Sequence, residues 1–232
     1  SQQNKKRKKK KQSTSSAKVR VDEKCDDQNE INREVINGID TQTNGQVAKR
    51  VSDLAFEQRP NFVVHCGDLV DTGGTKTDWT ETFFPSMRPL IEHAPLAPVL
   101  GNHEQDARLY YDYMSLPAPE YYYTFEYGNA QFFMIDSNRK VAPGSEQFTF
   151  LERELKRSKA EWKIVCYHHP AYTSDENDYG NTWYGPSTHG DLRTRKLVPL
   201  FDKYGVDIVW NGHIHSYERT WPIRADEATA PA

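Results

Sequence analysis

Residues 61–71, NFVVHCGDLVD, contain the pattern that decides how the rest of the chain is interpreted. The apolar run NFVVHC has the length and the β-branched content of a buried strand. A glycine and two carboxylates follow it, namely Gly67, Asp68 and Asp71. In open α/β sheets, ligands gather beyond the carboxyl ends of the strands, so we expect these side chains to belong to a binding site.

Three more strand-like runs end in the same way. They are LAPVL followed by GNHE (96–104), WKIVCY followed by HHP (162–170) and VDIVW followed by NGHIH (206–215). Five of the eight histidines lie in these endings, and parallel strand ends would bring them to one place. The alternative is that each polar group merely caps its strand. Four independent caps in the ordered set GDxxD, GNHE, HHP and GHxH would be a rare coincidence, so we favour a site.

These residue types fit a pair of metal ions. Imidazole and carboxylate together suit zinc, iron or manganese. Asp68 is the natural bridge, because a carboxylate has two oxygens and can contact two cations at once. His213 and His215 are two residues apart in an extended segment, so they can serve neighbouring ions or the same ion.

The rest of the chain alternates between strand-like and helix-like segments. Strands are indicated at 34–39, 61–66, 96–100, 121–127, 130–136, 162–167 and 206–210, with a hairpin at Gly128-Asn129. Helices are indicated by apolar spacing within 47–55, 79–90, 148–155 and 197–201. The sequence therefore predicts an α/β (α+β) domain without internal repeats, whose inner strands are covered on both faces. The tyrosines between 110 and 123 could line a substrate rim, but packing is the simpler interpretation.

The formal charge of −3 over 232 residues hides two unlike parts. Residues 1–20 hold nine of the 30 basic residues and no acid, so the other 212 residues carry 21 bases against 33 acids, a charge of −12. We expect a basic, disordered head at residues 1–34 and a domain at residues 35–232. The acidic domain argues against nucleic acid as a partner. No apolar run reaches the roughly 18 residues that a membrane span needs.

The three cysteines do not indicate a fold that is cross-linked by disulfides. They are Cys25, Cys66 and Cys166, an odd number without any CxxC spacing, which argues against a disulfide scaffold or a zinc finger. Cys66 and Cys166 each lie in a short apolar run, so we expect them to be small buried core residues.

The four strand endings resemble the motifs of the calcineurin-like metallophosphoesterases, and most of all those of the purple acid phosphatase branch. The resemblance lies in GDLVD (67–71), GNHE (101–104), IVCYHHP (164–170) and WNGHIHSYERTWP (210–222). It spans about residues 35–222 and implies a two-layer β-sandwich flanked by helices, the metallo-dependent phosphatase-like fold. It also implies a dinuclear metal site at one edge of the sandwich and suggests a secreted or periplasmic location.

The resemblance also implies a division of the ligands between two ions. Asp68 would bridge both ions, and His215 would bind one of them. The ligands that complete the shell of the other ion would be Asn102, His168 and His213.

Three other histidines receive different roles. The family pattern Val-x-x-His is matched by Val165 and His168, so we expect His169 to support the ligands rather than bind metal. His103 would lie next to the phosphate and donate a proton to the leaving oxygen, and its alternative role is to orient a ligand carboxylate. His189 either reaches the substrate side or is a solvent-exposed loop histidine.

The sequence departs from the family pattern at two motifs. The purple branch has GDxxY, whose tyrosine binds iron and produces the colour, whereas Asp71 stands here as a substitute ligand or a turn residue. We therefore expect no tyrosinate charge-transfer band, and zinc or manganese beside iron as candidate ions. The family's Asp-x-His or Asp-x-Gly motif is matched by Asp40, a predicted ligand, and more weakly by Gln42. Polar residues interrupt the strand before Asp40, although this fold requires a central, buried strand there.

We expect a phosphoric ester hydrolase that acts on phosphomonoesters like an acid phosphatase, using a hydroxide activated by two metal ions. The expected partner is a small phosphorylated substrate. A phosphodiesterase or nuclease using the same site is one alternative, and a binding module with a degraded site is another, motivated by the poor first strand. The chain stops soon after GHxH, so we expect a domain that is truncated at its C-terminus.

Overall fold

The computed structural model of this protein describes residues 36–37, 41–42, 44–176, 186–225 and 227–228. Contacts divide the chain into residues 1–31 and 32–232, and every described residue belongs to the second part. The predicted boundary between residues 34 and 35 lies outside the described residues and stays a prediction.

The first sheet has three parallel strands in the order β1-β2-β3. They are β1 (Ile36–Asn37), β2 (Val63–His65) and β3 (Leu96–Pro98). The predicted first strand is present, but the prediction that it is central is wrong for the sheet as described, because β2 holds the middle place and β1 an edge. A continuous apolar run suits the middle strand, and a short strand with polar neighbours suits an edge.

The second sheet has four strands in the order β4-β5-β6-β7. They are β4 (Tyr123–Tyr127), β5 (Ala130–Met134), β6 (Trp162–Cys166) and β7 (Ile208–Trp210). The first two form the predicted antiparallel hairpin, in which Gly128 takes a φ of +58°. β5, β6 and β7 run parallel, so β6 and β7 deliver their C-terminal loops to the same edge. A separate antiparallel pair joins β8 (Ile223–Arg224) and β9 (Glu227–Ala228).

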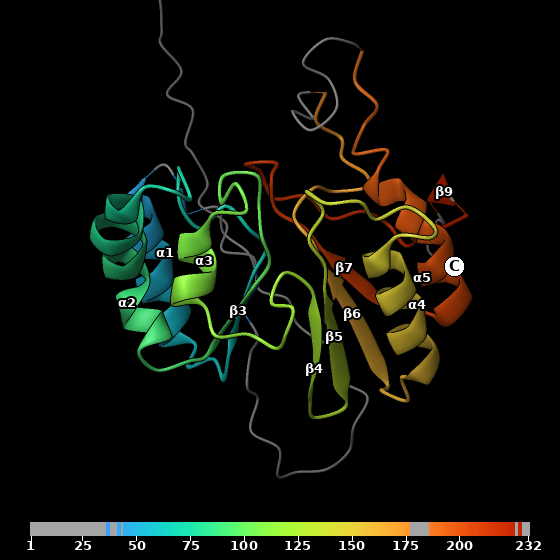
Figure 1. Ribbon diagram of the computed structural model, residues 1–232, viewed down its shortest axis with the longest axis horizontal. Coiled ribbons are helices and arrows are strands. Elements are labelled where there is room, and N and C mark those ends of the chain that lie inside the picture. Colours follow the sequence, from blue (N-terminus) through green and yellow to red (C-terminus); the bar gives the residue numbers. More distant parts are fainter. Residues whose placement is uncertain (1–35, 38–40, 43, 177–185, 226, 229–232) are drawn as a thin grey trace, which may run out of the picture. The chain divides into compact units, whose positions relative to one another are not determined.

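Helices cover the outer face of each sheet, as Figure 1 shows. On the first sheet these are α1 (Gly45–Glu57), a π-helix (Asp78–Phe83), α2 (Phe84–Ile91) and α3 (Arg108–Tyr113). On the second sheet they are α4 (Glu146–Arg157), a 3₁₀ turn (Thr194–Leu197) and α5 (Val198–Tyr204). The two sheets face each other across a core of their own. The predicted sandwich with flanking helices is confirmed.

The strands alternate between two buried faces. In β5, Phe132 and Met134 enter the core between the sheets, whereas Phe133 packs under α4 and α5. In β6, Cys166 faces the core between the sheets and Val165 faces the helices. This period of two, with both faces apolar, explains why these runs read as continuous hydrophobic segments in the sequence.

Local signals set several helix ends. The Asn44 side chain caps α1 by accepting a hydrogen bond from the amide of Val47 at 3.2 Å, and Ser145 caps α4 in the same way through Phe148 at 3.3 Å. Gly205 ends α5 in the left-handed conformation with a φ of +64°, which glycine adopts without a steric cost.

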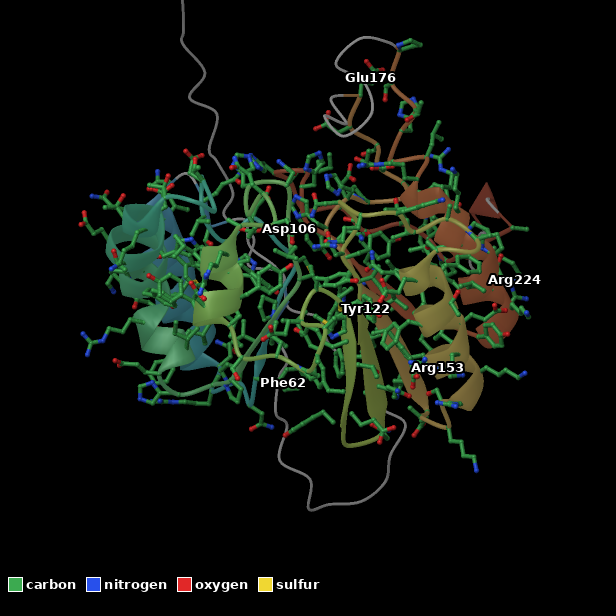
Figure 2. The ribbon with its side chains drawn as sticks, in the orientation of Figure 1. Phe62, Asp106, Tyr122, Arg153, Glu176 and Arg224 are labelled. Atoms are coloured by element: carbon green, nitrogen blue, oxygen red, sulfur yellow. The ribbon has the colours of Figure 1, made fainter. Side chains whose placement is uncertain are left out.

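Two smaller predictions are confirmed by burial. Cys66 and Cys166 are both buried in the core between the sheets. Tyr122, labelled with Phe62 in Figure 2, packs beneath α4 and donates its hydroxyl to Glu146 at 2.7 Å. Among the described helices, none is long and apolar enough to cross a membrane.

Candidate metal centre

Asp68 lies directly after β2, at the carboxyl end of the first sheet. Its side chain is buried, and its backbone takes a left-handed φ of +55°, a costly conformation that clusters at functional sites. One carboxylate oxygen accepts a hydrogen bond from the amide of His103 at 3.0 Å, and the other lies 3.0 Å from Nε2 of His168. Asp68 therefore joins the loops that follow β3 and β6.

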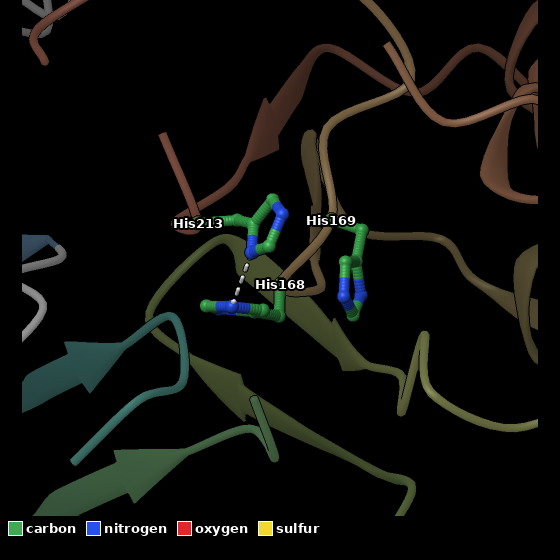
Figure 3. A group of neighbouring side chains, drawn as sticks. All are labelled: His168, His169 and His213. Atoms are coloured by element: carbon green, nitrogen blue, oxygen red, sulfur yellow. Dashed lines mark hydrogen bonds between the residues drawn. The ribbon is translucent and has the colours of Figure 1, made fainter. Parts of the chain in front are cut away.

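The Nε2 atom of His168 is the point on which the predicted ligands converge. It lies 3.0 Å from the Asp68 carboxylate, 3.1 Å from Oδ1 of Asn102 and 3.2 Å from Nδ1 of His213. Figure 3 shows the last of these contacts as a dashed line. Four predicted ligands of one ion, taken from the loops after β2, β3, β6 and β7, thus meet in one place.

The chemistry of these atoms fits a cation. The other ring nitrogen of His168, Nδ1, lies 2.7 Å from the Cys66 carbonyl, which can only accept, so Nδ1 carries a proton and Nε2 of the neutral ring presents a lone pair. The Asp68 and Asn102 oxygens also present lone pairs. Nε2 of His213 is buried and has no hydrogen-bond partner among the described residues. A set of convergent lone pairs is unfavourable by itself and becomes favourable around a positive ion.

His169 lies beside this group, as Figure 3 shows. Its ring centre is 4.9 Å from that of His168 and 4.6 Å from that of His213, and one ligand atom from each ring lies within 4.8 Å of the others. The Nδ1 atom of His169 lies 2.8 Å from the hydroxyl of Ser137. This contact with Ser137 agrees with the supporting role that we expect for His169.

Burial controls the protonation of this group. Desolvation lowers the pKa of His213 to about 4 and also lowers the pKa of His169, so both rings are neutral near pH 7. Burial would raise the pKa of the Asp68 carboxyl, but without an ion a second proton on His168, at Nε2, outweighs burial through its hydrogen bond and charge and holds that pKa below its usual value. A metal ion would take the place of that proton. Neutral imidazoles and an ionised carboxylate are the forms that bind metal.

Glu104, the last residue of GNHE, has a role that the motif alone did not reveal. Its fully buried carboxylate accepts hydrogen bonds from four backbone amides. The donors are Gly101 at 2.6 Å, Leu69 at 2.7 Å, Asp68 at 2.9 Å and Val70 at 3.3 Å. Burial, followed by the charge of Asp68, raises the pKa of Glu104 to about 7. We call this arrangement the Glu104 clamp, because it ties the GD loop to the GNHE loop.

Glycine is required where these two loops touch. A Cβ atom on Gly101 would collide with the backbone and carboxylate of Asp68, and one on Gly67 would collide with the backbone of Gly101 and the ring of His168. Gly67 also takes a φ of +95°. The glycines of GD and GN therefore permit the close approach on which the convergence of the ligands depends.

His103 lies at the outer side of the group and is partly exposed. Its Nδ1 atom lies 2.7 Å from the Asp71 carbonyl and 3.7 Å from the Asp71 carboxylate. The sequence predicts that Asp71 is either a substitute metal ligand or a turn residue. These contacts indicate a different role, which is to hold the His103 ring. The His103 side chain retains 31% of its exposure, so it can be reached from solvent.

The segment after β1 reaches the same edge of the sheets. The amide of Thr41 donates to the Asp68 carbonyl at 3.1 Å, and the Thr41 hydroxyl donates to the Leu69 carbonyl at 2.7 Å. Next to it, Nε2 of Gln42 lies 3.1 Å from Nε2 of His215. Asp40 lies outside the described residues, so its assignment as a ligand stays a prediction.

His189 is exposed in a loop whose preceding residues, 177–185, are not described. Its carbonyl accepts hydrogen bonds from Thr173 at 3.0 Å and from Arg195 at 2.9 Å. These contacts involve the backbone of His189 and not its imidazole, so the role of the imidazole toward a substrate stays a prediction.

Comparisons with known proteins identify relatives of this chain. The family description "Calcineurin-like phosphoesterase" matches residues 41–217. Over 188 residues, 70% of the chain, the sequence is 29% identical to "Probable inactive purple acid phosphatase 27" of Arabidopsis thaliana, of which it covers 30%. Over 200 residues, 74% of the chain, it is 28% identical to "Nucleotide pyrophosphatase/phosphodiesterase" of Hordeum vulgare, of which it covers 52%. The chain thus spans about a third to a half of these relatives.

Among solved structures, the fold is similar to that of the purple acid phosphatase PPD1 from seeds of yellow lupin, Lupinus luteus. The TM-score is 0.70 at 23% sequence identity, and the match covers 85% of this chain and 40% of the lupin chain. At this identity the similarity shows the fold, and it agrees with the double sheet and its flanking helices.

Proposed function

Because the chain belongs to the calcineurin-like phosphoesterase family, with purple acid phosphatases among its relatives, we propose that it hydrolyses phosphomonoesters at a pair of metal ions. The observation that supports this proposal most strongly is the convergence of Asp68, Asn102 and His213 on Nε2 of His168. The proposed substrate class is a small phosphorylated molecule.

In this proposal the four converging side chains would hold one ion. Asp68 would also serve the second ion, together with His215 and Asp40. Zinc, iron and manganese all suit this donor set. When bound, the two ions neutralise the charge of the phosphate and lower the pKa of a coordinated water.

His103 is the proposed proton donor to the leaving oxygen. Its Nδ1 atom is held by the Asp71 carbonyl, which leaves Nε2 as the free end of the ring. A proton on Nε2 can then pass to the oxygen that leaves from phosphorus, and the nearby Asp71 carboxylate stabilises the charged ring before the transfer. Asp71 is thus a positioning residue in this proposal.

A phosphodiester substrate is the second candidate, and it is supported by the name of the barley relative, which is a nucleotide pyrophosphatase/phosphodiesterase. The same ligands and the same His103 would serve either ester. A binding module without activity is the third possibility, and the name of the Arabidopsis relative, which includes the word inactive, keeps it among the outcomes of the test.

The test compares p-nitrophenyl phosphate with bis(p-nitrophenyl) phosphate, with metal analysis of the same sample. We expect turnover of the monoester, about two metal ions per chain and loss of activity on chelation. Asp68→Ala should reduce turnover to background. Asp53→Ala, which removes an exposed carboxylate paired with Lys49 on α1, should retain it.

Three outcomes contradict the proposal. Turnover of the diester alone supports the phosphodiesterase. The absence of both metal and turnover supports the binding module. Full activity of Asp68→Ala would show that this carboxylate is not the bridge.

A further inference from the structure

Gln42 has a buried amide oxygen without a hydrogen-bond partner. Its side chain is 5% exposed, and Oε1 contacts no donor among the described residues, whereas Nε2 lies 3.1 Å from Nε2 of His215. A buried polar atom that lacks a partner costs about 1–3 kcal/mol, so such an atom beside a candidate metal centre requires an explanation.

The two orientations of the amide leave different problems. If the nitrogen of Gln42 faces His215, it donates to the lone pair on Nε2 of His215, and Oε1 remains without a donor among the described residues. If the oxygen faces His215 instead, Oε1 and Nε2 of His215 present lone pairs to each other, unless the ring carries its proton on Nε2.

A cation between the two side chains removes the repulsion in the second orientation, in which Oε1 faces His215. An amide oxygen and a neutral imidazole nitrogen both present lone pairs, and both are ordinary metal ligands. We propose that Oε1 of Gln42 is a ligand of the second ion together with His215. This inference rests on the proposed function, because it places Gln42 in the shell of an ion that the proposed hydrolase requires.

The backbone supports the placement of Gln42. Its neighbour Thr41 is tied to the GD loop by two hydrogen bonds, to the carbonyls of Asp68 and Leu69. The Gln42 backbone is therefore anchored beside the proposed bridging carboxylate, while its side chain contacts His215 from the loop after β7.

The identity of the ligand has a consequence for metal preference. An amide oxygen is a harder and weaker ligand than an imidazole for ions such as zinc, whereas manganese discriminates less between them. The second site should therefore bind its ion more weakly than the first, and its preference for zinc over manganese should be small.

The experiment titrates metal-free protein with Zn²⁺ and, separately, with Mn²⁺ by isothermal calorimetry, with metal content measured by mass spectrometry. The wild type should bind two ions in two steps of different affinity. Gln42→Ala should weaken the weaker step by about tenfold or more and leave the stronger step unchanged. Gln42→His should tighten the weaker step for zinc more than for manganese.

Gln131→Ala is the matched control. Gln131 is also buried, and its Oε1 also has no hydrogen-bond partner, but it lies in β5 and donates to Thr124. Both binding steps should be unchanged in this variant. Thermal unfolding of each variant separates a loss of fold from a loss of ligand, and Gln42→His keeps the test decisive if Gln42→Ala does not fold.

Wild-type affinities for both steps in Gln42→Ala would overturn the assignment of Gln42, and so would a single binding step in the wild type. Equal changes for zinc and manganese in Gln42→His would overturn it as well. A single binding step in the wild type would also count against the pair of ions in the proposed hydrolase, whereas the results for the Gln42 variants do not bear on it. The proposed hydrolase fails on its own test if the wild type does not turn over the monoester or if Asp68→Ala remains active.

Discussion

The two sides of the metal centre are built differently. On one side, the buried GD loop is joined to the GNHE loop by the Glu104 clamp, whose carboxylate accepts hydrogen bonds from four backbone amides. On the other side, the loop after β7 carries His215 at an exposed position, followed by Tyr217 and Trp221, which are 63% and 62% exposed. Glu218 ties this loop to the hydroxyls of Thr173 and Ser174 at 2.6 and 2.5 Å.

This difference indicates which part of the site is formed before a metal ion binds. The backbone around Asp68, and that of Gly101 next to Asn102, is held by hydrogen bonds to the buried Glu104 carboxylate, in which no ion takes part. The position of His215 depends on an exposed loop and on its contact with Gln42. We therefore expect the first ion to bind a preformed site and the second ion to order part of its own site.

The largest effect should come from breaking the clamp. Glu104→Ala leaves four buried amides without an acceptor, so we expect it to lower the free energy of unfolding by on the order of 3–5 kcal/mol. Glu104→Gln retains one acceptor oxygen and should lose about half as much. Urea unfolding of the metal-free proteins measures both, because metal binding would otherwise add its own stabilisation.

Glu92→Ala is the control for this prediction. Glu92 pairs with Arg88 on the surface of α2, and its loss should change the free energy of unfolding by less than about 0.5 kcal/mol. If Glu104→Ala were as stable as Glu92→Ala, the buried loops would not depend on the clamp.

The next effect should appear in turnover. His103→Ala removes the proposed proton donor, so we expect kcat to fall by about 10²–10⁴-fold while the metal content stays at the wild-type value. His93→Ala, which removes an exposed histidine at the end of α2, is the matched control and should be fully active. Asp71→Ala should lower kcat less than His103→Ala, because it removes the carboxylate and leaves the backbone carbonyl that holds the ring.

An unchanged kcat in His103→Ala would assign proton donation to another group. A loss of metal in that variant would instead support the alternative role of the His103 imidazole, which is to orient a ligand carboxylate.

The smallest effect should be a dependence of stability on pH. Burial lowers the pKa of His65 from 6.5 to about 4. Between these two values the unfolded chain binds more protons at this position, so the stability that His65 contributes is present above pH 6.5 and is lost as the pH falls toward 4. The loss should approach about 3 kcal/mol at the acid end.

The difference between wild type and His65→Gln isolates this contribution, because other groups titrate in both proteins. Urea unfolding at intervals from pH 4 to pH 7 should show the stability of the wild type falling more steeply toward acid than that of the variant. Parallel curves would mean that His65 is not desolvated in the folded protein.

The sequence predicted the fold well, because the decisive strands are buried on both faces. Strands such as β2 and β6 have no face exposed to solvent, so they can be recognised in the sequence as continuous apolar runs. The convergence of Asp68, Asn102, His168 and His213 also followed from the sequence, since parallel strand ends meet at one edge.

The sequence did not predict contacts that depend on loop conformation. Gln42 and His215 are 173 positions apart and touch through two irregular segments. The role of Glu104 depends on amides of a loop in which Asp68 adopts a left-handed backbone, a conformation that only a small fraction of aspartates take. Neither feature has a periodic signal that a single sequence can carry.

The central claim is that the four side chains around His168 bind a metal ion. The most direct measurement is X-ray anomalous scattering from a crystal of the active protein, with data collected at the zinc, iron and manganese absorption edges. We predict an anomalous peak bonded to Asp68, Asn102, His168 and His213, with a second peak on the side of His215 and Gln42. Active crystals without an anomalous peak at these four residues would contradict the account.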